Sequence, residues 1–212
     1  VAMSAADILV IPEIYANVMS QVKNLPCKKV ALFHNEPYLT ATIPVGVTWA
    51  DMHIYDAVTT TRENEKLLND YFPYINTWVV SPSISEVFRP AKEPQSLLIN
   101  VLSKEQEDID KIIKPFYWKF PVYQWVSFRD LRGLPQETLA DALRDGAITI
   151  WLDDKTSFGY TLLESLKCGS IVLAKIPDNP TDWMLKEEGT LIDGPIWFNN
   201  VRDLPEMVAS VV

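Results

Sequence analysis

The sequence has few cysteines and no long apolar run. Cys27 and Cys168 are far apart, and neither has a cysteine or histidine neighbour at metal-ligand spacing. We therefore expect two reduced, half-buried structural thiols, which favours a cytoplasmic protein. No apolar run approaches the roughly 20 residues that a membrane-spanning helix needs. No charged-then-apolar leader is visible either.

Positive charge is also scarce. The chain has 19 lysines and arginines against 28 aspartates and glutamates, a formal net charge of −9, with no long run of one sign. Because nucleic-acid binding requires a basic face, we do not expect nucleic acid as a partner. The charge does not exclude binding of a small anionic ligand, since such a ligand needs only a local cluster of hydrogen-bond donors.

Several catalytic motifs are missing. The sequence contains no P-loop, no dinucleotide-binding glycine triplet and nothing that resembles a nucleophile elbow, which argues against a kinase or a dehydrogenase. What remains is ordinary for a folded protein, with 48% apolar and 22% charged residues. A chain of 212 residues can form one large domain or two small ones, each with a core of its own.

Short apolar runs alternate with amphipathic stretches along the whole chain. This pattern predicts an α/β protein with parallel sheets covered on both faces. Strands are expected at residues 7–11 (buried on both faces), 28–34, 57–61, 76–80, 96–102, 122–128, 147–152 and 170–174, with short strand-like runs at 190–192 and 195–198. Helices are expected at residues 13–23, 62–71, 104–114, 135–144, 159–167, 178–188 and 204–211, and residues 35–56 are expected to be irregular.

Three prolines within residues 81–95 mark the best candidate for a hinge. We therefore expect two Rossmann-like domains, residues 1–88 and 89–212, with a ligand cleft between them. The chain opens almost directly on a strand, so the first domain is expected to be incomplete.

Residues 148–174 carry the strongest functional signal. They are typical of a buried strand, a polar turn, a short helix and a second buried strand, and such turns lie where parallel sheets bind ligands. The helix would direct unpaired backbone N–H groups and its positive dipole end at the ligand, an arrangement that suits a phosphate. Glu164 lies one to two turns into this helix, where its carboxylate can accept hydrogen bonds from a ligand hydroxyl.

Residues 156–174 resemble the nucleotide-sugar signature of GT-B-type glycosyltransferases, and in particular the retaining, family 4-like enzymes of glycosyltransferase group 1. The positions that keep the signature are Phe158, Gly159, Glu164, Cys168, Gly169 and Val172. Other stretches resemble further segments of the family in the same order, namely residues 7–12, 30–34, 79–90, 126–128 and 134–148. The resemblance implies two Rossmann-like parallel-sheet domains in a GT-B-like arrangement.

The resemblance also implies roles for individual residues. Glu164 would bind the ribose hydroxyls of the donor, and His34 would be the catalytic residue beside the transferred sugar. Backbone N–H groups for the diphosphate or donor sugar would come from Ser157, Phe158, Gly159, Tyr160 and Thr161. Lys104 would support the diphosphate, and the backbone near Phe128 and Arg129 would receive the base.

Two positions depart from the family pattern. Thr156 stands in the donor site where the family has a glutamate that contacts the sugar, and Lys104 is one cation where two are usual. The expected activity is transfer of a sugar from a nucleoside-diphosphate sugar to a glycan or lipid-linked acceptor, with retention, in polysaccharide biosynthesis. No metal or other cofactor is expected, because the helix dipole and cations would stabilise the diphosphate.

The location is expected to be cytoplasmic. The sequence leaves open whether the protein lies at the inner face of the membrane, whether it associates peripherally with the membrane, and whether it forms a homodimer. Two other functions also stay open. One is a catalytically silent, glycosyltransferase-like module that binds a nucleotide or a partner, which Thr156 and the single cation favour. The other is a sugar-phosphate epimerase, which would need a pair of catalytic carboxylates.

Overall fold

The structure, a computed structural model, divides into two compact units. It describes residues 3–93, 95–104, 106–156 and 158–212. One unit ends at Ser83 and the other begins at Ile84. The predicted boundary after residue 88 lies further along the chain. The difference arises because Phe88 is fully buried in the second unit, where Ile84 and Val87 pack against the same core.

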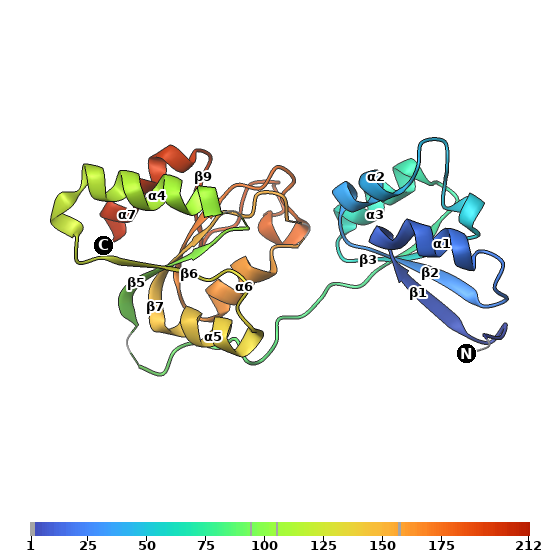
Figure 1. Cartoon of the computed structure of the whole chain (residues 1–212), viewed down its shortest axis with the longest axis horizontal. Coiled ribbons are helices and arrows are strands. Elements are labelled where there is room, and N and C mark those ends of the chain that lie inside the picture. The colour runs from blue at the N-terminus through green and yellow to red at the C-terminus, as the bar shows by residue number, and fades with distance from the viewer. Residues whose placement is uncertain (1–2, 94, 105, 157) are drawn as a thin grey trace. The chain divides into compact units, whose positions relative to one another are not determined.

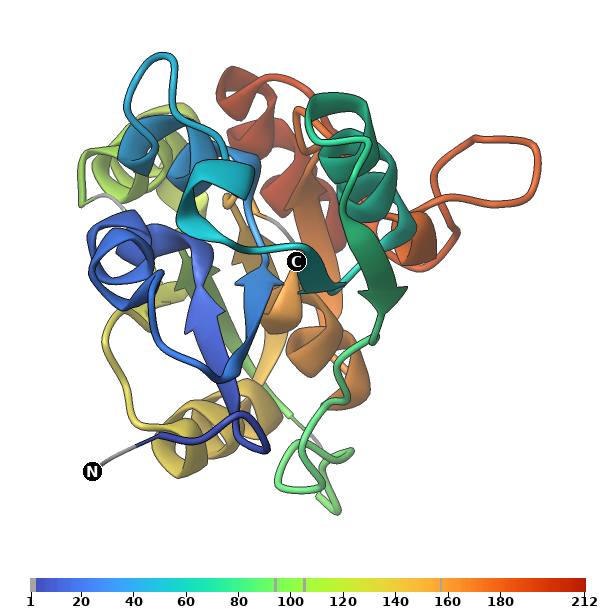
Figure 2. The same cartoon turned by 90° about the vertical axis from the view of Figure 1, so that its right-hand side faces the viewer.

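The first unit is a four-stranded parallel sheet in the order β1-β2-β3-β4. Its elements are β1 (Ile8–Pro12), α1 (Ala16–Val22), β2 (Lys28–Phe33), α2 (Glu36–Thr42), β3 (Asp56–Thr59), α3 (Arg62–Tyr71) and β4 (Asn76–Val79). The chain moves one strand at a time in one direction, so its right-handed crossovers place α1, α2 and α3 on the same face of the sheet (Figures 1 and 2).

The opposite face of this sheet carries no helix in the part of the chain that the structure describes. Leu9 and Ile11 of β1 point to the helices and join the core, whereas Ile8 and Val10 point the other way. Ile8, Val10 and, on β4, Trp78 are 62%, 52% and 47% exposed. The prediction that the first strand is buried on both faces is therefore wrong, because β1 is an edge strand with one bare face.

Two local features of the first unit bear on the predictions. Residues 36–42 were expected to be irregular but form α2, whose first turn accommodates Pro37 because the N–H that proline lacks has no intrahelical partner there. α3 lies at the predicted residues 62–71, and its amino end is capped by the Thr61 hydroxyl, which accepts the backbone N–H of Asn64 at 3.1 Å.

The second unit is a five-stranded parallel sheet in the order β6-β5-β7-β8-β9. Its elements are β5 (Ser96–Leu102), α4 (Gln106–Lys119), β6 (Ser127–Asp130), α5 (Gln136–Asp145), β7 (Gly146–Trp151), α6 (Tyr160–Lys167), β8 (Ile171–Lys175), β9 (Ile196–Phe198) and α7 (Leu204–Val211). The direction of winding reverses between β5 and β7. The carboxyl ends of these two strands therefore form the switch point at which open α/β sheets bind ligands.

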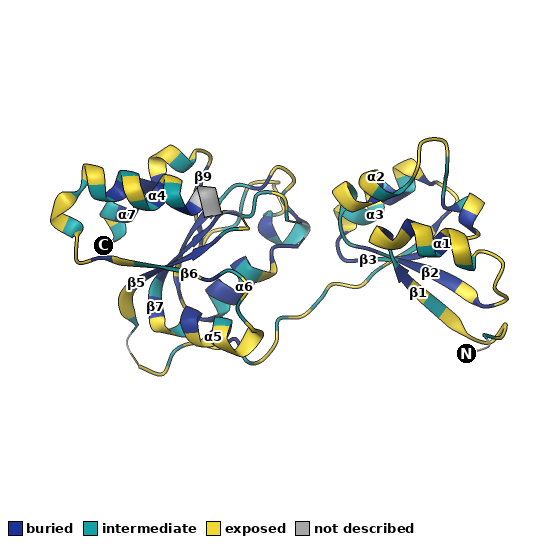
Figure 3. Ribbon diagram, in the orientation of Figure 1, coloured by how far each residue is buried: buried dark blue, intermediate teal, exposed yellow. Residues whose placement is uncertain are grey.

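Helices cover both faces of the second sheet (Figure 1). Ile99 and Val101 of β5 pack with residues of α4 and α7, while Leu102 packs with Trp151 and with Leu162 of α6. This alternation follows from the two-residue period of a strand. Figure 3 shows the outward sides of the helices as the exposed surface.

Two predicted elements of the second unit are wrong. The strand expected at residues 122–128 is β6 at Ser127–Asp130, and residues 121–123 form a 3-10 turn that begins at a proline. The helix expected at residues 178–188 is a single 3-10 turn at Asp182–Met184. After it the chain folds back on itself, and Leu185 pairs with Leu191 in an antiparallel bridge.

Candidate functional site

The carboxyl ends of β5 and β7 bring Lys104 and Asp153 together. The two strands are paired along their length, with Leu102 opposite Trp151, and each functional residue follows two positions later. Nζ of Lys104 lies 2.9 Å from Oδ1 of Asp153. The lysine side chain is 66% exposed. The second unit therefore has the Lys104 ammonium at its switch point, where it is paired with Asp153 and exposed to solvent.

The next strand adds a second pair of the same kind. Lys175, the last residue of β8, forms an ion pair with Asp154. Both aspartates of the loop after β7 are thus engaged by lysines from neighbouring strand ends. In the described part of the chain, no group of three or more histidines, cysteines, aspartates or glutamates is arranged to hold a metal ion.

The turn between β7 and α6 is closed by its own hydrogen bonds. The Thr156 hydroxyl accepts the backbone N–H of Gly159 at 2.8 Å, and the carbonyl of Phe158 accepts the indole N–H of Trp183 at 2.6 Å. The N–H of Gly159, which the resemblance assigns to the ligand, is therefore used within the turn. Ser157 lies outside the described residues.

Gly159 is required at this turn for two reasons. Its φ of +77° lies in the left-handed region that side chains rarely adopt. A Cβ at this position would also lie 2.4 Å from Cε of Met184, a fully buried side chain. The residues after β8, where the sequence predicts a helix at 178–188, thus pack directly on the start of α6.

Glu164 is a buried carboxylate on α6. Tyr160 and Thr161 form the first turn of this helix, and the Thr161 hydroxyl accepts the indole N–H of Trp151 at 3.0 Å. Burial raises the pKa of Glu164 above its ordinary value. Among the described residues, no group donates a hydrogen bond to this carboxylate. Although the residue is 9% exposed, neither carboxylate oxygen is a buried atom without a partner, so the carboxylate stays accessible to hydroxyl donors from a ligand.

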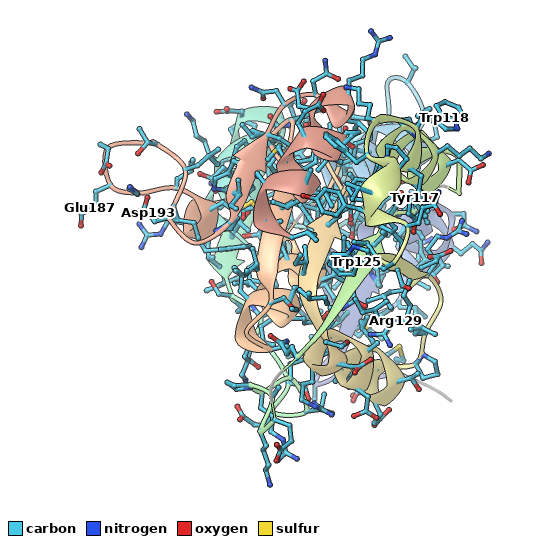
Figure 4. All side chains as sticks on the ribbon, turned by 90° about the vertical axis from the view of Figure 1, so that its left-hand side faces the viewer. Tyr117, Trp118, Trp125, Arg129, Glu187 and Asp193 are labelled. Carbon is cyan, nitrogen blue, oxygen red and sulfur yellow. The ribbon has the colours of Figure 1, made fainter. Side chains whose placement is uncertain are left out.

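The guanidinium of Arg129 serves the fold of the second unit. It donates to Oδ1 of Asn100 and to Oδ2 of Asp145, each at 3.0 Å, and to the carbonyl of Ala142. These partners fix the last turn of α5, and Figure 4 shows Arg129 beside that helix. Because α5 ends just before β7 begins, the side chain points toward the amino edge of the sheet. The predicted role of this stretch concerned its backbone, which lies near the end of β6.

A cavity that the sequence analysis did not anticipate lies at the ends of β8 and β9. Its volume is about 620 Å³, and cations from three different elements line it. These are Lys111 of α4, Lys175 and Arg202, together with the side chains of Asn199 and Asn200. The cations come from separate segments of the chain, so no local sequence pattern announces the cavity.

In the first unit, His34 stands at the carboxyl end of β2. Its side chain is 38% exposed. Glu13, which follows the neighbouring strand β1, is fully buried. Oε1 of Glu13 accepts the backbone N–H groups of His34 and Asn35, each at 3.1 Å, and Oε2 lies 3.6 Å from Nδ1 of the imidazole. The sequence analysis missed Glu13, although an acidic residue directly after a parallel strand was the available signal.

The structure thus gathers most predicted donor-site residues at one sheet edge. These are Lys104, Thr156, Phe158, Gly159, Tyr160, Thr161 and Glu164, all of which follow β5 or β7. His34 belongs to the first unit and is described within that unit. The predicted cleft between the two units stays a prediction.

Two general predictions can be compared with the structure directly. Both cysteines are free thiols, as expected, but they are buried rather than half-buried, and burial raises the pKa of Cys168. In the described part of the chain, no helix is long and apolar enough to cross a membrane.

Comparison with known proteins finds a curated relative and a larger set of similar solved structures. An alpha-1,6-glucosyltransferase of Actinobacillus pleuropneumoniae serotype 7 (strain AP76) is 21% identical over 207 residues, which cover 90% of this chain and 62% of that protein. No protein-family model matches the chain. The sucrose-phosphate synthase of Thermosynechococcus elongatus superposes with a TM-score of 0.62 at 9% identity, over 96% of this chain and 64% of that one. The chain is glycosyltransferase-like.

The second solved structure agrees on the fold. It is a crystal structure of the GtfA/B complex, with a TM-score of 0.52 at 13% identity over 99% of this chain and 50% of that one. The predicted class, α/β with two Rossmann-like parallel sheets of GT-B type, is confirmed. This chain spans less than two thirds of each of these three proteins. The assignment to the retaining group 1 enzymes stays a prediction.

Proposed function

We propose that this glycosyltransferase-like chain transfers a sugar from a nucleoside-diphosphate sugar to a glycan or lipid-linked acceptor, with retention. The observation that carries the proposal is the buried Glu164 carboxylate, which has no protein donor among the described residues. It lies on the helix that begins at the carboxyl edge of the second sheet. Ribose hydroxyls would supply the hydrogen bonds that this carboxylate lacks.

Catalysis would rest on positioning and on positive charge at the leaving group. The ammonium of Lys104 and the amino end of α6 lie on the same sheet edge, so both would stabilise the departing diphosphate. His34 would lie beside the transferred sugar. Since these groups supply positive charge, the proposal includes no metal ion. We place the reaction in the cytoplasm, in polysaccharide biosynthesis, and peripheral membrane association and a homodimer stay open.

Nucleotide binding gives the first test. We expect UDP, GDP or ADP to bind by isothermal titration calorimetry, and Glu164→Ala to weaken that binding by at least about tenfold, the equivalent of one hydrogen-bonded charged group. Glu137→Ala is the matched control, because Glu137 is an exposed carboxylate on α5 of the same unit. A chain that binds none of the three nucleotides would contradict the proposal.

Sugar transfer gives the second test. Release or transfer of the sugar from the matching nucleotide sugar should occur with the intact chain and disappear in His34→Ala, while nucleotide affinity stays the same. His53→Asn is the control, since His53 is an exposed residue with a left-handed backbone that asparagine tolerates.

A catalytically silent module that binds a nucleotide or a protein partner is the second candidate. It is favoured by the hydroxyl of Thr156, which closes the turn by accepting the N–H of Gly159. A carboxylate at this position is what the resemblance would offer to a donor sugar. Nucleotide binding without any turnover of nucleotide sugars would support this candidate over the enzyme.

A further inference from the structure

We propose that Glu13 is a positioning residue that holds the neutral imidazole of His34 as the tautomer protonated at Nδ1. Nε2 then faces outward as a hydrogen-bond acceptor. The use of that acceptor by a sugar hydroxyl rests on the proposed function. The tautomer itself does not.

The first step is the place of the carboxylate. Glu13 and His34 follow β1 and β2, which are adjacent parallel strands, so both lie at one edge of the first sheet. The Glu13 side chain is 1% exposed. A charged group is buried to this extent when nearby donors compensate for its lost hydration. For Oε1 the compensation is complete, because the N–H groups of His34 and Asn35 both donate to it.

The second step concerns the other carboxylate oxygen. Oε2 of Glu13 is buried and has no hydrogen-bond partner among the described residues. Nδ1 of His34 lies 3.6 Å away, beyond hydrogen-bond length but close enough for a strong electrostatic effect. An unprotonated Nδ1 would direct its lone pair at a buried anion, whereas a protonated Nδ1 directs a donor at it. The carboxylate therefore favours the proton on Nδ1.

The third step is that hydrogen bonds and packing restrain the backbone of both Glu13 and His34. The Asn64 side chain donates to the carbonyl of His34 at 2.8 Å. The single Thr42 hydroxyl hydrogen is shared between the carbonyls of Tyr38 and Glu13, at 2.8 and 3.0 Å. Phe33, directly before His34, is fully buried. The backbone at both residues is thus held in place, so the imidazole and the carboxylate stay next to each other.

The consequence concerns which ligand group His34 can meet. With Nδ1 protonated, Nε2 of the neutral ring carries a lone pair. It accepts a hydrogen bond from a hydroxyl and does not donate one to a phosphate oxygen. If the chain transfers sugars, His34 would accept from a hydroxyl group of the donor sugar or of the acceptor.

Nitrogen NMR of the ligand-free chain tests the proposal directly. Long-range ¹H–¹⁵N correlations at alkaline pH, where imidazoles are neutral, should show Nδ1 of His34 protonated and Nε2 unprotonated. The chain has two histidines, so His53→Asn assigns the signals. Asparagine suits the left-handed backbone of residue 53, whose φ is 56°. A wild-type His34 protonated at Nε2 would overturn the proposal without any further variant.

Glu13→Gln provides the sharper test. The glutamine carbonyl can keep the two backbone N–H groups, while its amide NH₂ replaces Oε2 and donates to Nδ1. The tautomer should therefore reverse to Nε2–H. Glu63→Gln, an exposed position on α3, should leave it unchanged. A folded Glu13→Gln chain whose tautomer stays the same would also overturn the proposal.

If sugar transfer is observed, Glu13→Gln should lower kcat by about 10- to 100-fold, by analogy with the loss of groups that orient metal-binding histidines. The donor KM should change by less than about twofold, and the rate with Glu63→Gln should equal that of the wild type. The two proposals can fail separately. A chain with the expected tautomer but no transfer would contradict the enzyme alone, and transfer with the opposite tautomer would contradict the role of Glu13 alone.

Discussion

The ammonium of Lys104 and the carboxylate of Asp153 lie 2.9 Å apart, at the ends of the two strands where the second sheet changes its direction of winding. The lysine is largely exposed, so this pair is a weak one in water and contributes at most about 1 kcal/mol to stability. The Lys104 ammonium can therefore exchange its ion pair with Asp153 for one with an anionic ligand that binds at this edge of the sheet.

Replacement of Lys104 and replacement of Asp153 should have opposite effects on the affinity for a diphosphate. Lys104→Met should weaken the binding of a nucleoside diphosphate by about tenfold, the value of one charge-assisted contact. Asp153→Asn should strengthen it, because the lysine loses its competing anion. Calorimetry at two salt concentrations measures both effects, and Lys92→Met, at another exposed lysine of the same unit, serves as the control. Equal affinities for wild type and Lys104→Met would show that the cation does not meet the diphosphate.

The buried Glu164 should make the stability of the second unit depend on pH. Burial raises the pKa of this carboxyl, so the unfolded chain loses the proton at a lower pH than the folded chain does. Between the two pKa values the folded state binds more protons, and stability therefore falls as pH rises through that window. Above the window the folded chain carries a buried charge at full cost.

Glu164→Gln removes that cost. At pH 8 we expect the variant to be more stable than the wild type by on the order of 1 kcal/mol, which corresponds to about 2 to 4 °C in melting temperature. The gain should vanish near pH 4, where the unfolded carboxyl takes up its proton. Thermal melts without nucleotide measure the difference. As a control, Glu137→Gln should have the same melting temperature as the wild type at both pH values. A difference that is independent of pH would show that charge is not the cause.

Loss of the Arg129 guanidinium should affect the fold and leave nucleotide affinity intact. Arg129→Met removes hydrogen bonds to Asn100, to Asp145 and to the carbonyl of Ala142. We expect a loss of about 1 to 3 kcal/mol in the free energy of unfolding, since Asn100 is fully buried and loses a charged partner. Denaturant unfolding and nucleotide titration measure the two properties.

Lys186→Met is the comparison for this experiment, because its partner Asp193 is 93% exposed and the pair is worth less than about 1 kcal/mol. A strong loss of nucleotide affinity in a stable Arg129→Met chain would instead assign the side chain to the ligand.

The alternation of strands and helices was largely predictable, because it depends on local apolar runs. The sequence predicts a strand at residues 96–102 and a helix at residues 62–71, and β5 and α3 have these bounds. Exposure of a strand face was not predictable, since it depends on where later helices cross. The apolar run at β1 is compatible with a central strand buried on both faces and also with an edge strand that has one exposed face.

The wrong elements have a common cause in tertiary packing. Residues 178–188 satisfy a helical pattern apart from Pro180, yet Met184 is drawn into the core against Gly159 and the chain folds back after it. α2 was missed because Pro37 was taken as a sign of irregular structure, although the first turn of a helix tolerates proline.

The candidate site was predictable where one segment supplies it. The turn and helix after β7 place Thr156, Gly159 and Glu164 by local sequence alone. Contacts between segments were not predictable. The partnership of Glu13 with His34 depends on the neighbouring positions of β1 and β2, which only the sheet register reveals.

The uncovered side of the first sheet affects how the protein behaves in solution. When two such surfaces meet, water in contact with Ile8, Val10 and Trp78 is released, and this release favours association of the chains at high concentration. The face also carries the ion pair of Lys28 with Asp56, and the lysine lies over the Trp78 ring, but added sulfate would strengthen the apolar part of the attraction. Purified samples should therefore self-associate more at high concentration and in precipitating salts than a chain of net charge −9 would otherwise suggest.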